Sequence, residues 1–424
     1  MKVAVVGLGY VGLPLAIRLS QLNFDVLAID IYSEKIEKLQ NGILPFAQNE
    51  PYLNGYFQKE YKRGKISFST TFEKIIENDL VFICVDTPII DKIPDYHSLK
   101  QSLKSTAPNL KNGSIVIIES TISPNTSKNL VIATLKKHSN LKINQDFFVA
   151  AAPERIRPNY IFEQLTSLSR VIGVSDKKIV SKLKDIYSQI TSGEINFTNL
   201  TTAETVKTVE NSLRDVNIAF ANEVAIACEE QGVNVWEVRK LINKSPFHNM
   251  LEPGAGVGGH CIPKDPWLLA SSVKKHQMRL IETARSINDN MPAHVFALAE
   301  EALRKKKIKI ANANLAILGY AYVGNSDDIR NSPTESLIKI LKNKRVKYEV
   351  HDPVVKKYSK TTVEEILRGS NCLVLMVSHS AYKNLDLGRV SKLISTKIII
   401  DGRNFFDKEK ITKAGFLYKG VGNV

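Results

Sequence analysis

The sequence predicts an α/β protein in which two doubly wound α/β domains are joined by a central helical segment. Short apolar runs alternate with helical patterns at the start of the chain, helical periodicity fills the middle, and the alternation returns near residue 314. Such alternation is typical of a sheet that is covered by helices on both faces. We expect domains at residues 1–198, 199–305 and 306–424.

The first domain is expected to begin with a strand at 3–6, a helix at 13–22 and a second strand at 26–29. Later apolar runs predict further strands, at 80–85, 114–118, 147–151 and 171–173. Nearly continuous apolar runs are typical of parallel strands that are buried on both faces. We therefore expect one parallel sheet that ends near residue 195.

The middle segment is expected to be mostly helical. Apolar residues recur at steps of three and four, at Val206, Val209, Leu213, Val216 and Phe220, which predicts a long amphipathic helix. Long helices between two α/β domains commonly form a dimer interface, so we expect a homodimer or a higher homo-oligomer. In the last domain, strands are expected at 315–318, 347–351, 372–377 and 397–400, with a helix at 334–341.

Composition narrows the class of protein. Apolar residues make up 43% and charged residues 24% of the 424 residues, and no apolar run approaches the roughly 20 residues that span a bilayer. The N-terminus lacks the pattern of a signal peptide, so we expect a cytoplasmic protein without a membrane partner. The net charge of +15 is spread along the chain without an RNA-binding motif, which favours small anionic ligands and no nucleic acid.

The four cysteines form no CxxC pair, so we expect neither a metal site nor a disulfide framework. Cys84, Cys228 and Cys372 lie in apolar patterns and are expected to be buried, the usual position of a free cysteine. Cys261 differs, because Gly, His and Pro surround it.

A glycine motif indicates a Rossmann-like dinucleotide site. Gly7, Gly9 and Gly12 form a GxGxxG between the first strand and the first helix. They permit a tight turn, close approach of a pyrophosphate, and close packing of helix on strand. Asp30 follows the second strand, where its carboxylate would accept hydrogen bonds from a ribose and repel a 2′-phosphate. The cofactor is therefore expected to be NAD.

Two threonines, Thr87 and Thr121, follow buried strands at the edge where ligands bind in open sheets. Their hydroxyl groups suit contacts to the cofactor or to an activated water, although either residue alone also suits a turn or a helix cap.

The segment 253–266 carries the strongest chemical signal. Four of its residues are glycines, at positions 254, 256, 258 and 259, which let the backbone curl around a ligand, and Cys261 follows. A thiolate is a strong nucleophile, and nearby cations lower its pKa. His260, Lys264 and Lys207 are candidate cations, and Asp265 would balance charge or hold a water. The alternative is a small residue that fills a loop.

Lys207 and Asn211 stand four residues apart, on one face of the predicted long helix, and Arg214 follows on nearly the same face. A lysine beside an asparagine suits an oxyanion, since one supplies charge and the other a fixed donor. The alternative is a solvated helix face.

With these motifs, the chain resembles the UDP-glucose/GDP-mannose dehydrogenase family nearly from end to end. The resemblance rests on residues 7–12 with Asp30, on Pro153-Glu154-Arg155, on 200–211, on 258–266 and on 327–333. It implies three domains: one for NAD, one helical for dimerisation and one for the nucleotide. By position, it implies NAD contacts from Val11, Asp30, Lys35, Thr87, Thr121 and Arg330. It implies contacts to the sugar nucleotide from Arg155, Ile156, Lys207, Asn211, Arg214 and Gly258.

The resemblance also implies the chemistry. Cys261 would be the nucleophile, with Lys207, Asn211 and Asp265 beside it, and Glu154 would act as general base or hold the hydrolytic water with Thr121. The reaction would be the four-electron oxidation of the C6 hydroxymethyl group of a UDP-N-acetylhexosamine to the uronate. UDP-N-acetyl-D-mannosamine is the first candidate substrate. UDP-N-acetylglucosamine and UDP-glucose are alternative substrates. A catalytically silent protein that binds NAD or a nucleotide sugar is the alternative from another class.

Three places in the sequence depart from the family pattern. Val323 stands where a lysine commonly helps to hold the substrate, and 245–248 reads Ser-Pro-Phe-His instead of containing His-Pro-Arg. His248 is the candidate to replace the missing cations in substrate binding. Pro158-Asn159 stands in place of the common Pro-Gly.

Overall fold

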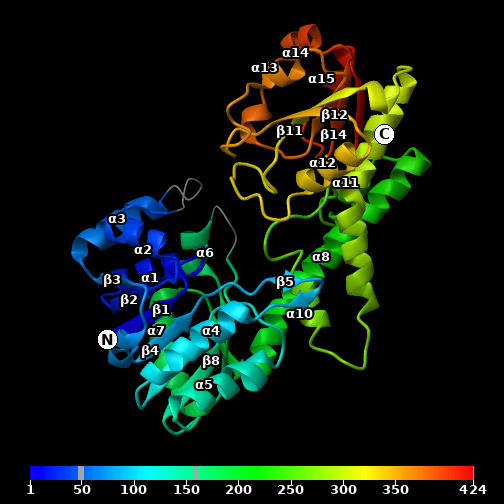
Figure 1. Cartoon of the computed structure of the whole chain (residues 1–424). Coiled ribbons are helices and arrows are strands. Elements are labelled where there is room, and N and C mark those ends of the chain that lie inside the picture. The colour runs from blue at the N-terminus through cyan, green and yellow to red at the C-terminus, as the bar shows by residue number, and fades with distance from the viewer. Residues whose placement is uncertain (46–51, 157–159, 424) are drawn as a thin grey trace. The chain divides into compact units, whose positions relative to one another are not determined.

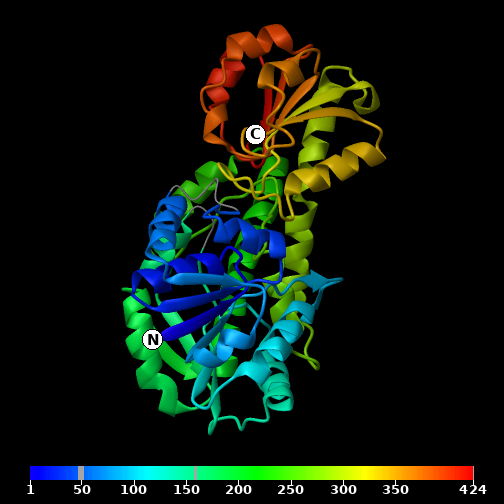
Figure 2. The ribbon, with the colours of Figure 1, turned by 60° about the vertical axis from the view of Figure 1, so that its left-hand side comes forward.

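The computed structural model describes residues 1–45, 52–156 and 160–423, which form two compact units. One unit comprises Met1–Asn211 and Lys264–Gln277, and the other comprises Ser212–Pro263 and Met278–Val424. Each contains a mainly or wholly parallel sheet with helices on both faces, so the predicted α/β class is confirmed (Figures 1 and 2). In the described ranges, no helix is long and apolar enough to cross a membrane.

The sheet of the first unit has the strand order β10-β9-β8-β7-β4-β1-β2-β3. Its strands are β1 (Lys2–Val6), β2 (Asp25–Ile29), β3 (Ile66–Ser69), β4 (Leu80–Ile83), β7 (Ser114–Ile118), β8 (Phe147–Ala151), β9 (Arg170–Val174) and β10 (Ile195–Asn199). A separate two-stranded ribbon pairs β5 (Ile89–Ile90) with β6 (Ile93–Pro94). The central strands are buried throughout, as their apolar runs predicted.

Helices cover both faces of this sheet. One face packs against α1 (Gly12–Gln21), α2 (Ser33–Gln40), α3 (Leu53–Arg63), α6 (Ile161–Ser167) and α7 (Val180–Ile190). The other packs against α4 (His97–Thr106), α5 (Ile132–Ser139) and the start of α8. Alternate residues of β1 serve the two cores: Val3 and Val5 belong to the first, and Ala4 and Val6 to the second.

Two strands, β9 and β10, run opposite to the other strands of a sheet that was predicted to be parallel. β9 runs antiparallel to β8, with Ala151 opposite Gly173, and parallel to β10. An apolar run predicts that a strand is buried but not which way it runs. Because β9 is reversed, its first residue, Arg170, lies at the edge where β8 ends.

The second unit contains an all-parallel sheet of order β12-β11-β13-β14-β15. Its strands are β11 (Asn314–Leu318), β12 (Lys347–His351), β13 (Cys372–Leu375), β14 (Ile398–Asp401) and β15 (Leu417–Gly420). One face packs against α13 (Val363–Leu367), α14 (Leu387–Leu393) and α15 (Lys408–Lys413). The other packs against α11 (Arg279–Lys305), α12 (Pro333–Asn343) and the later part of α8.

The predicted long helix is α8 (Leu200–Gln231), a single helix of 32 residues. It is followed by α9 (Val235–Ile242) and α10 (Asp265–Ala270). Much of its predicted apolar stripe is exposed: Leu213 is 58% and Phe220 59% exposed, and Val206 and Val209 are also exposed. Most of the stripe is therefore not covered by the described chain, whereas Val216 is half-buried.

The cysteines follow the sequence prediction with one exception. Cys228 and Cys372 are buried, in α8 and β13, whereas Cys84 is half-buried and lies one residue beyond β4. Cys84 was therefore wrongly assigned to the strand. Cys261 is exposed.

Candidate active site

The glycine turn between β1 and α1 contains two closely packed glycines and one that borders open space. A Cβ added at Gly7 would lie 2.7 Å from the Cys84 carbonyl oxygen, and one at Gly12 would lie 1.8 Å from the Gly7 carbonyl oxygen. A Cβ at Gly9, in contrast, would have no described atom within 4 Å. Gly7 and Gly12 are therefore required by packing, while Gly9 borders open space, which fits a pyrophosphate close to the backbone. Val11 immediately precedes α1.

Asp30 is anchored beside this turn. Its Oδ2 accepts a 2.8 Å hydrogen bond from the Leu8 amide and lies 2.7 Å from the ammonium of Lys35. Its Oδ1 accepts a hydrogen bond from the Tyr32 amide. The structure therefore joins two of the predicted cofactor residues, Asp30 and Lys35, to the glycine turn.

A second cluster of polar residues in the first unit lies beyond the ends of β4 and β7 and includes residues of α8 and α10. The Thr87 hydroxyl donates a 2.6 Å hydrogen bond to the Thr121 carbonyl, and the Lys264 ammonium lies 3.2 Å from the same hydroxyl. Lys264 also lies 3.3 Å from Oδ1 of Asp265, whose Oδ2 accepts a 2.5 Å hydrogen bond from Asn211. A proline at the start of α10 suits the first turn of a helix.

Two predicted catalytic residues, Asn211 and Asp265, are thus in direct contact. Lys207 lies one turn before Asn211 on α8 and is buried. Two cations, Lys207 and Lys264, are therefore buried in this unit, and Lys264 contacts Thr87 beyond the end of β4.

Glu154 and Arg155 lie just beyond β8. Oε1 of Glu154 accepts a 2.7 Å hydrogen bond from the Arg155 amide, and Oε2 forms an ion pair with Arg170. The guanidinium of Arg155 forms two 2.9 Å hydrogen bonds with Glu210. Arg155, predicted to contact the substrate, is therefore engaged with α8 in this structure. Ile156 packs against the core of the unit.

In the second unit, a series of buried hydrogen bonds holds the start of the glycine-rich segment 253–266, here called the glycine loop. The Gly254 amide donates to Oδ1 of Asn222 on α8, and the Asn222 amide group donates to Oδ1 of Asn288 on α11, both at 2.8 Å. Asn288 in turn donates to Asp215, which also accepts a 2.6 Å hydrogen bond from Arg285. The loop that leads to Cys261 is thus tied to both long helices.

The later part of the loop is tied to the C-terminal domain. The Gly259 amide donates to the Arg330 carbonyl at 2.8 Å, and Asn331 donates to the Gly259 carbonyl at 2.9 Å. A Cβ at Gly258 would lie 2.5 Å from that of Tyr322. The guanidinium of Arg330 pairs with Asp328. These contacts fix the loop two residues before the exposed Cys261.

Arg403 also contacts this loop. Its guanidinium donates to the carbonyl oxygens of Met376 at 3.0 Å and of Gly256 at 3.2 Å. Burial lowers its pKa to about 10, and the charge of Asp401 opposes that shift. The sequence analysis missed Arg403, because it lies about 150 residues from the loop; its only local signal is the position directly after the β14 strand and Gly402.

Among the described departures from the family pattern, Phe247, His248 and Val323 are exposed and Ser245 is half-buried. His248 is exposed, with Nδ1 3.0 Å from the Ser245 hydroxyl, and Phe247 is 88% exposed. Val323 and Arg214 are exposed as well. Pro158 and Asn159 lie outside the described residues.

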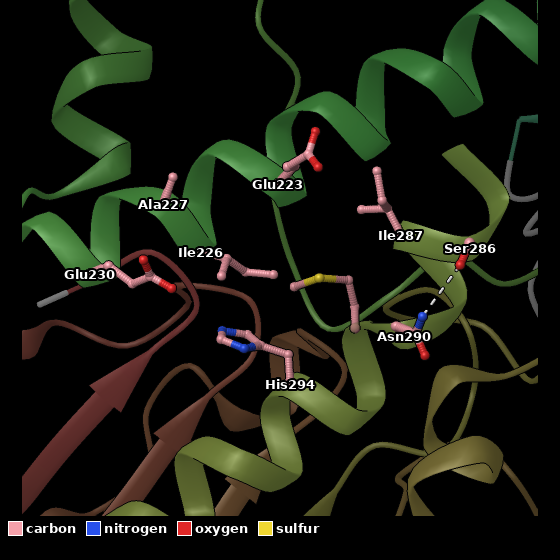
Figure 3. Close-up of a pocket in the computed structure, with 9 residues that line it drawn as sticks. Glu223, Ile226, Ala227, Glu230, Ser286, Ile287, Asn290 and His294 are labelled. Carbon is pink, nitrogen blue, oxygen red and sulfur yellow. Dashed lines mark hydrogen bonds between the residues drawn. The ribbon is translucent and has the colours of Figure 1, made fainter. Parts of the chain in front are cut away.

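A groove of about 420 Å³ lies between α8 and α11 (Figure 3). It is lined by Glu223, Ile226, Ala227, Glu230, Ser286, Ile287, Asn290, Met291 and His294. His294 pairs with Glu229 at 3.0 Å. The groove lining, as far as the described chain forms it, includes no predicted site residue, and its mixed apolar and polar character is typical of a protein–protein surface.

Comparison with known proteins agrees with these observations. Residues 1–191 match the NAD binding domain of the UDP-glucose/GDP-mannose dehydrogenase family, 201–290 its central domain and 316–408 its UDP binding domain. The UDP-N-acetyl-D-mannosamine dehydrogenase of Pyrococcus horikoshii is 39% identical over 422 residues, covering 100% of this chain and 99% of that protein. The Methanococcus maripaludis protein of the same name is 36% identical, with 100% and 97% covered.

A solved structure of the Pyrococcus horikoshii UDP-D-ManNAc dehydrogenase is 38% identical and has a TM-score of 0.95, with 100% of this chain and 99% of that chain covered. The matches span all three parts of the chain, and the first of them includes the glycine turn. The chain therefore belongs to the UDP-glucose/GDP-mannose dehydrogenase family and is an NAD-dependent nucleotide-sugar dehydrogenase.

Proposed function

We propose that this chain oxidises the C6 hydroxymethyl group of UDP-N-acetyl-D-mannosamine to the carboxylate, with two NAD consumed per sugar. The observation that carries the substrate assignment is the near-complete match to proteins of that name at 35–39% identity. Residues 1–198 would bind NAD, 199–305 would form the dimerisation segment with the cysteine loop, and 306–424 would hold the UDP-sugar.

In this proposal, the glycine turn with Val11, Asp30, Lys35, Thr87, Thr121 and Arg330 holds NAD, which accepts the hydrides when bound. Arg155, Ile156, Lys207, Asn211, Arg214, His248 and Gly258 contact the sugar nucleotide. The fixed position of Asp30 beside the turn supports the first set. The buried Lys207 and the Asn211–Asp265 pair support the second, because a cation and an oriented amide suit an oxyanion.

The proposed chemistry proceeds through Cys261. Loss of the hydroxyl proton and a hydride gives the C6 aldehyde, to which the Cys261 thiolate adds to form a thiohemiacetal. Loss of a second hydride and a proton gives a thioester, and water hydrolyses it to the uronate and the free thiol. Lys207 and Asn211 stabilise the oxyanion, and Glu154 acts as base or holds the water with Thr121. A thiol suits this sequence because its adduct retains the aldehyde for the second oxidation.

The same proposal places the enzyme in the cytoplasm and in polysaccharide biosynthesis. None of the four cysteines, all of which the structure describes, is in a disulfide, which is usual in a reducing compartment. A reducing compartment would also keep Cys261 available as a nucleophile.

We further propose that the chain forms a homodimer or a higher homo-oligomer through α8. The exposed stripe at Leu213 and Phe220, together with the groove between α8 and α11, supports this assembly (Figure 3). Contiguous exposed apolar surface of this kind is typical of an interface.

The test is an assay of NADH over a panel of UDP- and GDP-sugars that counts NADH formed per sugar consumed. Turnover of UDP-N-acetyl-D-mannosamine with two NADH per sugar is expected. One NADH per sugar would make the protein a simple alcohol dehydrogenase. Faster turnover of UDP-N-acetylglucosamine or UDP-glucose would show that one of these is the substrate instead. NAD binding without turnover of any sugar would identify a catalytically silent binding protein.

A further inference from the structure

Three buried charged side chains meet at the edge of the first sheet where β7 and β8 end. Glu119 follows β7, Glu154 lies beyond β8, and Arg170 begins the reversed strand β9. Arg170 forms an ion pair with Glu154, and its Nη1 lies 3.8 Å from Oε2 of Glu119. Each is at most 6% exposed. The Arg170 guanidinium is therefore the positive charge beside two carboxylates at a buried position.

The two carboxylates differ in their other partners. Oε1 of Glu154 accepts a hydrogen bond from the Arg155 amide, and Oε1 of Glu119 accepts a 2.6 Å hydrogen bond from the Tyr187 hydroxyl. Oε2 of Glu119 has no hydrogen-bond partner among the described residues. The backbone also couples the two sites, because the Glu154 amide donates to the Glu119 carbonyl at 3.2 Å.

Burying two anions beside one cation is unfavourable unless one of them takes up a proton. Burial raises the pKa of Glu119 to about 7; Arg170 opposes this shift and the charge of Glu154 adds to it. Near neutral pH, Glu119 therefore exists in part as the acid, which leaves the charge of Arg170 to Glu154.

Two other titratable side chains beside the cluster, Tyr187 and Cys84, stay neutral. Burial, followed by the charge of Glu119, raises the pKa of the Tyr187 hydroxyl on α7 and of the Cys84 thiol beyond β4. The guanidinium of Arg155 is paired with Glu210. Glu119 is thus the neighbour of Glu154 whose charge changes in the neutral range.

We propose that Arg170 is a positioning residue for the oxidation, which keeps the Glu154 carboxylate charged and in place, and that protonation of Glu119 leaves the charge of Arg170 to Glu154. The inference rests on the proposed role of Glu154 as base or water holder. A base acts only in its unprotonated form, so loss of the Arg170 charge should alter the acidic limb of the pH–rate profile.

The test compares the acidic limbs of the kcat profiles of wild type, Arg170→Met, Arg170→Lys and Glu119→Gln, with the sugar nucleotide that the panel identifies. Arg170→Met removes the favourable charge, so its limb should move to higher pH by about one unit or more. Glu119→Gln replaces a carboxyl group that is already protonated below its pKa of about 7, so its acidic limb should stay at the wild-type pH. Arg170→Lys keeps the positive charge, so its limb should move less than that of Arg170→Met. A shift in Arg170→Met that Glu119→Gln does not share would distinguish control of Glu154 from a general loss of structure.

Glu60→Gln is the matched control. Glu60 is a buried carboxylate of the same unit that pairs with Arg63 at 2.9 Å and accepts a hydrogen bond from Ser20, far along the chain from Glu154. Its substitution should lower stability without moving the acidic limb. The dissociation constant of NAD, measured by calorimetry for each variant, should stay within about twofold of the wild-type value.

Glu154→Gln separates this inference from the proposed function. A fall in kcat by about 100-fold or more is expected for loss of a general base. Wild-type activity in Glu154→Gln would remove the proposed role of Glu154. A strong loss there, combined with an unmoved limb in Arg170→Met or with equal shifts in Arg170→Met and Glu119→Gln, would overturn the inference. If Arg170→Met does not fold, Arg170→Lys decides: a smaller shift to higher pH supports the inference, and an unmoved limb refutes it.

Discussion

The side-chain amide of Asn211, on α8, donates a 2.5 Å hydrogen bond to Oδ2 of Asp265, the first residue of α10. The other oxygen of Asp265 lies 3.3 Å from the Lys264 ammonium. Asp265 therefore orients an amide and balances a buried cation at the same time. Both tasks suit a site that must stabilise negative charge during a reaction.

Replacement of Asp265 by Ala should destabilise the protein by about 3–5 kcal/mol, because it leaves the Lys264 ammonium buried without its counter-charge. The free energy of unfolding in urea measures the effect. Asp79→Ala is the control, since Asp79 forms a half-exposed pair with Lys111 at 2.9 Å and should lose less than about 1 kcal/mol. Equal losses in the two variants would contradict the assigned role.

The glycine turn allows a matched pair of substitutions. Gly9→Ala places its methyl group in open space, so the protein should fold normally while NAD binds more weakly, because the methyl group occupies the path of the pyrophosphate. Gly12→Ala places the methyl group 1.8 Å from the Gly7 carbonyl oxygen, so it should lower the melting temperature itself. Calorimetry of NAD binding and thermal melting separate the two effects. Unchanged NAD affinity in Gly9→Ala would contradict this view of the site.

Sequence patterns predicted the parts of the structure that local chemistry determines. The apolar runs located the central strands, and the glycine spacing located the turn before α1 and the loop before Cys261. The less apolar edge strands β3 and β10, and the last strand β15, lacked such a signal. The reversal of β9 was also missed, since strand direction depends on pairing with a distant segment.

The candidate site shows the same limit. Glu119 was visible beside Thr121 after a strand, but nothing near it in sequence indicated that Arg170 and Tyr187 would reach the same place. Such clusters are assembled from strands and helices that are tens of residues apart. The roles assigned to the individual site residues stay predictions.

Glu119 should make stability depend on pH in the neutral range. Its pKa of about 7 in the folded protein exceeds the ordinary value of about 4.3, so its favourable contribution is complete below about pH 4 and is lost as pH rises through 7. The melting temperature of the wild type should therefore fall relative to that of Glu119→Gln between about pH 5 and 8. Parallel melting curves for the two proteins over this range would show that Glu119 does not titrate there.

The exposed stripe of α8 should govern assembly. Changing Leu213 and Phe220 together to Asp should convert the oligomer into monomers, because it places charges in an apolar contact. Sedimentation velocity at micromolar concentration measures the change. Ile76→Asp, at an exposed position of the first unit, should leave assembly intact. A wild-type protein that sediments as a monomer would rule out the proposed oligomer.

The central claim is that the Cys261 thiol carries the half-oxidised sugar between two oxidations. Uronate formed by Cys261→Ala, measured in the presence of NAD and the sugar nucleotide, tests it most directly, with the buried Cys228→Ala as the control thiol. We predict that Cys261→Ala forms no uronate while Cys228→Ala remains active. Uronate release by Cys261→Ala at close to the wild-type rate would contradict the covalent route.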